Sequence, residues 1–382
     1  MKQPISFLTL YVNPAWRRIK DVPSSLLFPF WGNLIPESSF LSKEFFNSFS
    51  FDIRFYGITD DITKADAVFA PYRQATMMRH DPALLAECAQ TAKGAGLPLF
   101  VDGMGDGETP LGIDNACIMR YGGYRTLKEE LGRNRLPVHL RFESPNIRIQ
   151  VPTQVDDLLM RCQGGVFSVR HKGEEKPVVS FAGMVKTTFK NTVHQRLNEL
   201  PLYLRGILDD RYFAMSNGIF LRSKALRILE RSKRLVCKFE GQFFSPLSPR
   251  RSHDEMKTFR RGFVETILES DYCIDVRGYG NASYRLYEIL SLGRIPVIID
   301  TERHFPFSDV VDWRKFSLIV DFRDIKRLPD IIADFHASIS PEEFETMQRE
   351  ARAAYINCFR IDAQMPYIIR EFNKLRSAFD HQ

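Results

Sequence analysis

The sequence predicts an α/β protein with two Rossmann-like, doubly wound domains that face each other across a cleft. The chain has 382 residues, and a domain typically contains about 100–200, so the length suggests two domains. Strand-like and helix-like segments alternate along most of the chain, as expected of parallel sheets covered by helices on both faces. Residues 161–176, which are rich in glycine and charge, interrupt this alternation.

The first half contains five predicted strands and one clear helix. Each strand is apolar, rich in β-branched or aromatic residues, and bounded by glycine, proline or aspartate. A helix is predicted over residues 81–96, because Asp81 is a suitable N-cap, Pro82 suits the first turn, and Gly94 and Gly96 suit the end. The predicted strands are residues 6–12, 51–57, 66–72, 97–103 and 115–121.

The second half repeats the alternation and ends in two helices. The predicted strands are residues 177–183, 234–239, 272–276 and 295–299, and the predicted helices are near 188–199, 257–269, 283–292, 341–359 and 361–379. This pattern gives an N-terminal acceptor-side domain over 1–160, a linker over 161–176, and a C-terminal domain over 177–360. A final segment, 361–382, is expected to be a helix that packs back on the N-terminal domain.

Composition restricts the classes of partner. The net charge is +6, but no long basic tail is present, which argues against nucleic-acid binding. A phosphate-bearing substrate or light, peripheral contact with an anionic membrane suits this balance. The six cysteines show no metal-ligand spacing and are expected to be buried free thiols. The N-terminus does not resemble a signal peptide and no run reaches about 18 apolar residues, so we expect a cytoplasmic protein.

The segment 277–300, RGYGNASYRLYEILSLGRIPVIID, carries the main candidate site. Arg277 and Gly278 directly follow the predicted strand 272–276, and ligands of open parallel sheets bind beyond the carboxyl ends of the strands. The next helix is predicted to begin near Ser283, so its free N–H groups and the positive end of its dipole lie at the same edge. This arrangement suits a phosphate group.

Two arginines and a glutamate extend this predicted site. The guanidinium group of Arg277 can bind phosphate oxygens in two places. Arg285 and Glu288 are one turn apart on the predicted helix, so Glu288 is placed to accept hydrogen bonds from ribose hydroxyls. The pattern therefore predicts a site for a nucleoside diphosphate. A simpler interpretation stays open, in which Arg285 and Glu288 form an exposed ion pair and the glycines only make a loop.

An NAD-dependent oxidoreductase is a second interpretation of the same segment. Gly278, Gly280 and Ser283 form G-x-G-x-x-S, and Asp300 lies 20 residues after Gly280, close to the dinucleotide fingerprint. That fingerprint normally opens the first βαβ unit of its domain, whereas several predicted strands of the second half come before it here. Ser283 also replaces the third glycine. We therefore favour another phosphate ligand over NAD, and a non-catalytic module that binds a nucleotide or sugar remains a further alternative.

Residues 277–320 resemble the C-terminal signature of the exostosin family of glycosyltransferases. The family pattern is an Arg-Gly loop, an Arg and a Glu three residues apart on a helix, a Gly-x-Ile-Pro-Val strand, and a Pro-Phe-x-Asp segment before a Trp. This chain has all of them, at Arg277-Gly278, Arg285 and Glu288, residues 293–297, residues 306–309, and Trp313.

The resemblance implies a B-type glycosyltransferase fold and inverting transfer of a sugar from a nucleotide donor, usually a UDP-sugar. The segment FAG at 181–183, followed by Arg196, resembles the start of the family's donor domain. The residues that are then expected to bind the donor are Gly183, Arg196, Arg277, Gly278, Ser283, Arg285 and Glu288.

The resemblance also suggests an acceptor and a location. Eukaryotic members of the family are usually Golgi proteins with an N-terminal membrane anchor, and this N-terminus shows none. We therefore expect a cytoplasmic member of bacterial type, peripheral to the inner face of the membrane at most. Its expected acceptor is a glycan or lipid-linked glycan of surface polysaccharide or lipopolysaccharide synthesis.

Inverting transfer needs a base for the acceptor hydroxyl and positive groups for the leaving diphosphate. Arg277, Arg285 and the helix start supply positive charge, so neither a metal nor a cofactor is expected. The base is expected from the first half, in the loop VDGMGDGETP that follows the predicted strand 97–103. Its candidates are Asp102, Asp106 and Glu108. Asp300, Glu302 and His304, in the loop after strand 295–299, are expected near the donor sugar.

Overall fold

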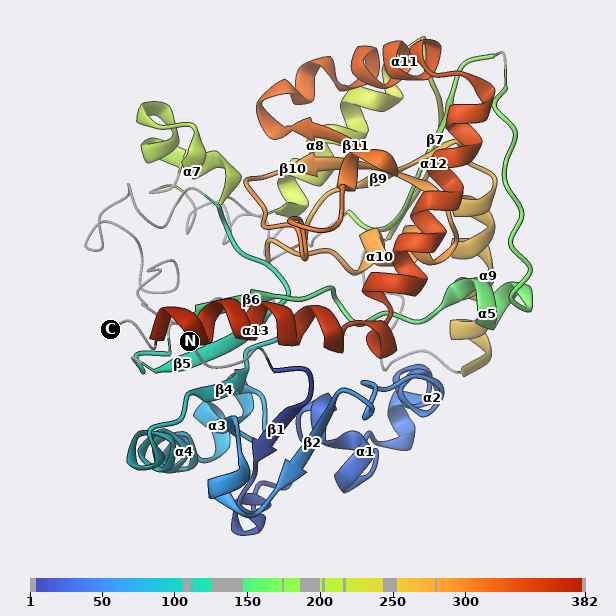
Figure 1. Cartoon of the computed structure of the whole chain (residues 1–382). Helices are drawn as coiled ribbons and strands as arrows, with labels where there is room; N and C mark the ends of the chain where they lie inside the picture. The colour runs from blue at the N-terminus through green and yellow to red at the C-terminus, as the bar shows by residue number, and fades with distance from the viewer. Residues whose placement is uncertain are drawn as a thin grey trace. The chain divides into compact units, whose positions relative to one another are not determined.

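The computed structural model describes residues 5–105, 111–113, 115–125, 147–173, 175–185, 200, 203–215, 218–242, 253–278 and 280–379. These residues form two compact units (Figure 1). Unit 1 comprises Met1–Pro152 and Cys358–Gln382, and unit 2 comprises Thr153–Asn357. The expected linker, 161–176, belongs to unit 2, where Arg170 Nε donates to Asp271 at 2.6 Å. Its charged residues therefore make tertiary contacts.

Unit 1 contains a parallel sheet of six strands in the order β2-β1-β3-β4-β5-β6. The five predicted strands are present, but the second begins at Tyr56 and not at Phe51, because Asp52 and Arg54 form a turn closed by a hydrogen bond from the Arg54 backbone. The sixth strand was not predicted. The strands are β1 (Leu8–Tyr11), β2 (Tyr56–Thr59), β3 (Ala67–Phe69), β4 (Leu99–Asp102), β5 (Ala116–Arg120) and β6 (Ile147–Gln150).

The helices of unit 1 include the predicted helix and the last helix of the chain. The predicted helix is α4, where the Asp81 side chain accepts from the Leu84 N–H at 3.1 Å and Gly96 ends the helix with φ of +63°. The last helix packs within unit 1, since the Phe372 and Phe100 rings lie 5.8 Å apart. The helices are α1 (Phe28–Trp31), α2 (Phe40–Ser48), α3 (Gln74–His80), α4 (Pro82–Ala95) and α13 (Met365–Phe379).

Unit 2 contains a parallel sheet of five strands in the order β11-β10-β9-β7-β8. Counted within the unit, this order is 2-1-3-4-5, a common doubly wound arrangement, and the first five strands of unit 1 follow the same order. The predicted fold class, α/β with two doubly wound Rossmann-like units, is therefore confirmed. The strands are β7 (Val178–Met184), β8 (Val236–Gln242), β9 (Tyr272–Asp275), β10 (Ile295–Asp300) and β11 (Leu318–Asp321), of which β11 was not predicted.

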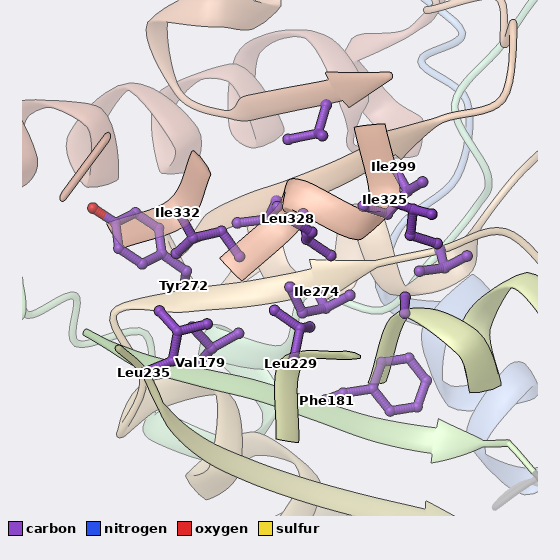
Figure 2. Close-up of a cluster of buried hydrophobic side chains, with 14 of the residues drawn as sticks. Val179, Phe181, Leu229, Leu235, Tyr272, Ile274, Ile299, Ile325, Leu328 and Ile332 are labelled. Atoms are coloured by element: carbon purple, nitrogen blue, oxygen red, sulfur yellow. The ribbon is translucent and has the colours of Figure 1, made fainter. Parts of the chain in front are cut away.

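Helices cover both faces of the unit 2 sheet. On one face, Phe181, Tyr272 and Ile274 pack against Leu229 of α8 and Leu328 of α11 (Figure 2). On the other face, side chains such as Cys273 pack against α5, α9 and α10. The helices are α5 (Leu158–Gln163), α7 (Arg211–Ala214), α8 (Gly218–Glu230), α9 (His253–Leu268), α10 (Tyr284–Ser291), α11 (Leu328–Ser338) and α12 (Pro341–Ala354), with a 3-10 segment η7 (Phe322–Arg327).

The predicted helix near 188–199 lies outside the described residues. Among the residues that are described, no helix combines the length and the apolar character needed to cross a membrane.

Candidate functional site

The candidate site lies where the strand order of unit 2 reverses. β7 pairs with β8 on one side and with β9 on the other, so the topological switch point is between β7 and β9. Doubly wound sheets bind ligands in the crevice at such a point, beyond the carboxyl ends of the strands. The residues at these ends are Gly183 and Met184 on β7, and Val276, Arg277 and Gly278 after β9. The predicted Arg-Gly loop is therefore at the ligand-binding edge.

Arg285 reaches this edge from the first turn of α10. Its Nε donates to the Ala182 carbonyl at 2.9 Å, and its guanidinium group lies 4.0 Å from the centre of the Phe181 ring. A Cβ atom on Gly183 would overlap the Arg285 Nη2 atom, and Gly183 has φ of +145°. Gly183 and Arg285 were both predicted to contact the donor, and the structure shows that Gly183 makes room for the side chain of Arg285.

Arg277 is almost completely buried at the same edge. One of its terminal nitrogens donates to the Ala214 carbonyl, and the other lies 3.4 Å from the Gly278 carbonyl. The start of α8 approaches this loop closely, because a Cβ on Gly218 would overlap the backbone carbonyls of Arg277 and Gly278. The loop after β9 is therefore fixed by its neighbours.

Arg222 is a third arginine of the site, and we did not predict it. Its terminal nitrogens donate to the Met184 carbonyl at 2.6 Å and the Val276 carbonyl at 2.8 Å, so it bridges the ends of β7 and β9. Burial, with the nearby charges of Arg285 and then Arg277, lowers its pKa to about 9. A sequence signal for Arg222 did exist, since it occupies a position on the apolar face of α8.

A buried ion pair completes the charge arrangement. Asp275, at the end of β9, is fully buried and accepts from Arg303 Nη1 at 2.8 Å. Arg222, Arg277, Arg285 and Arg303 are thus grouped at the carboxyl edge, where Asp275 pairs with Arg303 and lies near Arg222 and Arg285. Asp300 and Glu302 are also buried, at the end of β10. Grouping positive charges in a low-dielectric environment is unfavourable unless an opposite charge is nearby. The arrangement therefore favours an additional anion.

The start of α10 directs backbone N–H groups toward this edge. Ser283 is the N-cap residue of α10, but its side chain does not cap the helix. The positive end of the helix dipole therefore lies at this edge without a capping oxygen from Ser283. Thr301 Oγ1 donates to Asn281 Oδ1 at 2.6 Å and Asn281 Nδ2 donates to the Thr301 carbonyl at 3.2 Å, so the loops after β9 and β10 are joined.

Glu288 is held by an arginine of another helix. Arg260 Nη1 of α9 donates to Glu288 Oε1 at 2.7 Å, and both side chains are mostly buried, at 14% and 12% exposure. The simpler interpretation, an exposed pair of Arg285 and Glu288, does not describe these contacts. Arg260 was not predicted, and because it lies 28 residues from Glu288, spacing along one helix gave no signal for it.

The loop after β10 contains the three residues expected near a donor sugar. Asp300 Oδ1 accepts from the Arg303 backbone N–H at 3.0 Å, which helps to direct the Arg303 side chain toward Asp275. Glu302 has φ of +59°, unusual for a residue other than glycine, and accepts from Arg323 at 3.1 Å. His304 is half-buried. The sugar contacts themselves remain a prediction.

Of the three predicted base candidates, only Asp102 lies in the described part of the chain. It is fully buried at the end of β4, where Oδ2 accepts from Ser24 Oγ at 2.6 Å and Oδ1 accepts from the Met104 N–H at 2.9 Å. Burial raises its pKa, against the opposing effects of Arg73, Ser24 and Met104. Asp106, Glu108 and the predicted donor residue Arg196 lie outside the described residues.

Residues 233–335 match a family model described as the exostosin GT47 domain. Unit 2 contains an exostosin-family domain. This match confirms the resemblance predicted from residues 277–320. The matched range includes the loop after β9, α10 and Arg260, whereas Gly183 and Arg222 of the same site precede it.

Curated relatives agree with this family assignment over part of their length. A probable glycosyltransferase of Arabidopsis thaliana is 40% identical over 87 residues, which cover 23% of this chain and 16% of the relative. Exostosin-2 of Homo sapiens is 30% identical over 161 residues, which cover 40% of this chain and 22% of the relative. The Exostosin-1 homolog of Caenorhabditis elegans is 27% identical over 120 residues, covering 31% and 30%. The matched residues thus span less than a third of the length of each of these relatives.

Solved structures give only a distant likeness. HepE of Anabaena, solved in complex with UDP and glucose, aligns over 99% of this chain and 100% of its own, with 8% identity and a TM-score of 0.39. A sucrose-phosphate synthase of Thermosynechococcus elongatus aligns over 91% and 82%, with 12% identity and a TM-score of 0.36. These scores are too low to support any conclusion about ligands of the exostosin-family domain.

Proposed function

We propose that this protein is an inverting glycosyltransferase that uses a nucleoside-diphosphate sugar, with a UDP-sugar as the favoured donor. The observation that carries the proposal is the group of guanidinium groups at the switch point of unit 2, those of Arg222, Arg277 and Arg303 being buried, beside the start of α10 that the Ser283 side chain does not cap. A leaving diphosphate carries the negative charge that this site lacks. Stabilising that charge as the bond to the sugar breaks is the main electrostatic requirement of the transfer.

The individual residues have distinct proposed roles. Arg277 and Arg285 contact the diphosphate, and the N–H groups at the start of α10 bind a phosphate oxygen. Glu288 accepts hydrogen bonds from the ribose through the carboxylate oxygen that Arg260 does not hold. Since these cations can neutralise the leaving group, we propose that the transfer requires no metal ion or organic cofactor.

The acceptor side of the proposal rests on the sequence. We propose a glycan or lipid-linked glycan acceptor, a cytoplasmic location and peripheral contact with a membrane. We also propose a role in bacterial surface polysaccharide or lipopolysaccharide synthesis, whereas the curated relatives described above come from plants and animals. Asp102, Asp106 and Glu108 remain the proposed bases, and replacing each by its amide tests them individually through the rate of transfer.

Calorimetric titration of the whole protein tests the donor site. We expect UDP to bind, and we expect Arg285→Ala to weaken it by roughly 10- to 150-fold, since a hydrogen bond to a charged group contributes about 1.5–3 kcal/mol. Arg314→Ala, which removes an exposed arginine of the same unit, is the matched control. Equal UDP affinity in Arg285→Ala, Arg277→Ala and the control would exclude this donor site.

Turnover separates the catalytic proposal from its alternatives. A non-catalytic binding module would bind UDP but release no labelled sugar from a UDP-sugar, with or without glycan acceptors. An oxidoreductase would instead bind NAD in the same titration. Inversion is read from the anomeric configuration of the product relative to the donor.

A further inference from the structure

Unit 2 contains a cavity that none of the four grouped arginines of the candidate site lines. It has a volume of about 730 Å³ and lies between α7, α8 and η7. Its lining is largely apolar and aromatic, with Tyr203, Phe213, Phe220, Leu221 and Phe322 among its residues. This volume is within the range of sites that hold small organic molecules, but none of these side chains belongs to the donor site.

A row of exposed apolar side chains continues from the cavity. Tyr203, Leu204, Ile207 and Leu208 follow the spacing i, i+1, i+4 and i+5, which places them on one side of the helical segment 203–208. We call these four residues, together with Leu200, the apolar row. Side chains with this spacing normally pack into a core, yet those of the segment are 59%, 56%, 66% and 91% exposed, and that of Leu200 is 50% exposed. Leu200 and Tyr203 also line the cavity, so the two features form one continuous surface.

Specific contacts fix the direction of this row. A Cβ on Gly206 would overlap the Phe213 ring, so only glycine allows residues 203–208 to approach α7 this closely. The ring of Tyr203 lies 5.6 Å from that of Phe213, and Arg205 lies over the Tyr212 ring at 5.9 Å. The helical segment is therefore packed on α7 through Gly206, while the side chains of Leu204, Ile207 and Leu208 stay more than half exposed.

The charge beside the row is positive. Lys224 of α8 and Lys326 of η7 line the cavity and are exposed. Within the described part of the chain neither lysine has an ion-pair partner, whereas Arg323 is neutralised by Asp210 at 2.8 Å. The surface thus combines large aliphatic side chains with two uncompensated cations.

We propose that the apolar row and the adjoining cavity dock on an anionic lipid surface. Aliphatic side chains inserted among acyl chains, with lysines beside acidic head groups, are the combination by which proteins bind at a membrane interface. An acidic protein partner would also match the lysines. Lipid is favoured because the row ends in Leu208, which is 91% exposed and projects without an opposing wall among the described residues.

Co-sedimentation of the full-length protein with vesicles tests the proposal. We expect binding to vesicles of phosphatidylcholine with phosphatidylserine, and much weaker binding to phosphatidylcholine alone. The double variant Ile207→Ser/Leu208→Ser should bind at least tenfold more weakly, and Lys224→Gln/Lys326→Gln should lose about fivefold per lysine. Val166→Ser, which replaces an exposed apolar side chain of unit 2 outside the row, is the matched control and should bind like the wild type.

Two outcomes would overturn the lipid proposal. One is vesicle binding that is absent, or that is unchanged in the Ile207→Ser/Leu208→Ser variant. The other is self-association of the wild type in light scattering that the same variant abolishes, because the row would then be an interface between copies of the chain. Circular dichroism and thermal unfolding of each variant show that it is folded, and they keep this test independent of the donor-site proposal.

Discussion

Replacing Asp275 by asparagine tests whether the arginine site has excess positive charge. The substitution keeps the shape of the side chain but removes the carboxylate that is buried with Arg222, Arg277, Arg285 and Arg303. Removing one member of a buried ion pair typically costs about 3–5 kcal/mol. Unit 2 spans Thr153–Asn357, a size at which each kcal/mol lowers Tm by about 2–4 °C. We therefore expect Tm to fall by about 6–20 °C.

A bound anion should reverse part of this loss. Asp275 repels an anion at the site, so its removal strengthens binding as well as destabilising the unliganded protein. For an anion about 8 Å away, at an effective dielectric constant of about 20, the change is about 2 kcal/mol, or roughly 30-fold in affinity. Pyrophosphate should therefore raise the Tm of Asp275→Asn by more than it raises the Tm of the wild type.

Scanning calorimetry with and without pyrophosphate measures both the fall in Tm caused by the substitution and the rise in Tm caused by the bound anion. Asp330→Asn is the matched control, because Asp330 is 60% exposed and pairs with Arg234 at the surface, where ion pairs contribute little. The reasoning is refuted if Asp275→Asn is as stable as Asp330→Asn. It is also refuted if pyrophosphate stabilises Asp275→Asn no more than the wild type.

Three further substitutions probe separate parts of the structure. Arg260→Ala should weaken UDP binding by about tenfold and leave pyrophosphate binding unchanged, because Arg260 binds the carboxylate of Glu288 and does not contribute to the phosphate site. The control is Arg261→Ala, at the next and exposed position, which should change neither affinity in the same titrations. Gly183→Ala should displace the side chain of Arg285, which is packed against Gly183. Calorimetric titration should then show pyrophosphate binding weakened by at least tenfold. Asp102→Asn tests a pH effect by urea unfolding. Because burial raises the pKa of Asp102, the stabilising contribution of this side chain is present below the unfolded-state pKa of about 3.9 and is lost as the pH rises through the folded-state pKa. The wild type should therefore lose stability relative to the variant over that pH interval.

Most of the fold could be predicted because burial leaves a local signature. β9 and β10 are apolar up to the aspartate that ends each strand, as expected of parallel strands covered on both faces, and the sequence alone located both. The structure adds β11 (Leu318–Asp321) and α8, which were missed for different reasons. β11 is an edge strand in which Leu318 and Ile319 are only half-buried and Asp321 is exposed, and α8 carries Arg222, Lys224 and Arg227 within its apolar pattern.

The candidate site was predictable only where its residues are neighbours in sequence. Arg277 and Arg285 were found because they are close in sequence: Arg277 lies in the loop after β9, and Arg285 lies in the first turn of the helix that follows this loop. Arg222 was missed because its partners, the Met184 and Val276 carbonyls, are 38 and 54 residues away. For the same reason, the sequence did not reveal that Gly183 makes room for Arg285; the predicted contact of Gly183 with the donor stays a prediction.

The two units share a strand order but differ in what lies at the switch point, and this difference is why we propose a donor site in unit 2. In unit 1 the order reverses between β1 and β3, and the residues that follow these strands include Val12, Ala70 and Tyr72, all buried in the core. In unit 2 the corresponding edge carries Arg222 and Arg277. Because identical topology provides the crevice in both units, the fold alone does not select a nucleotide. The selection rests on buried charge, which unit 2 has at this edge and which is unfavourable there unless an anion binds.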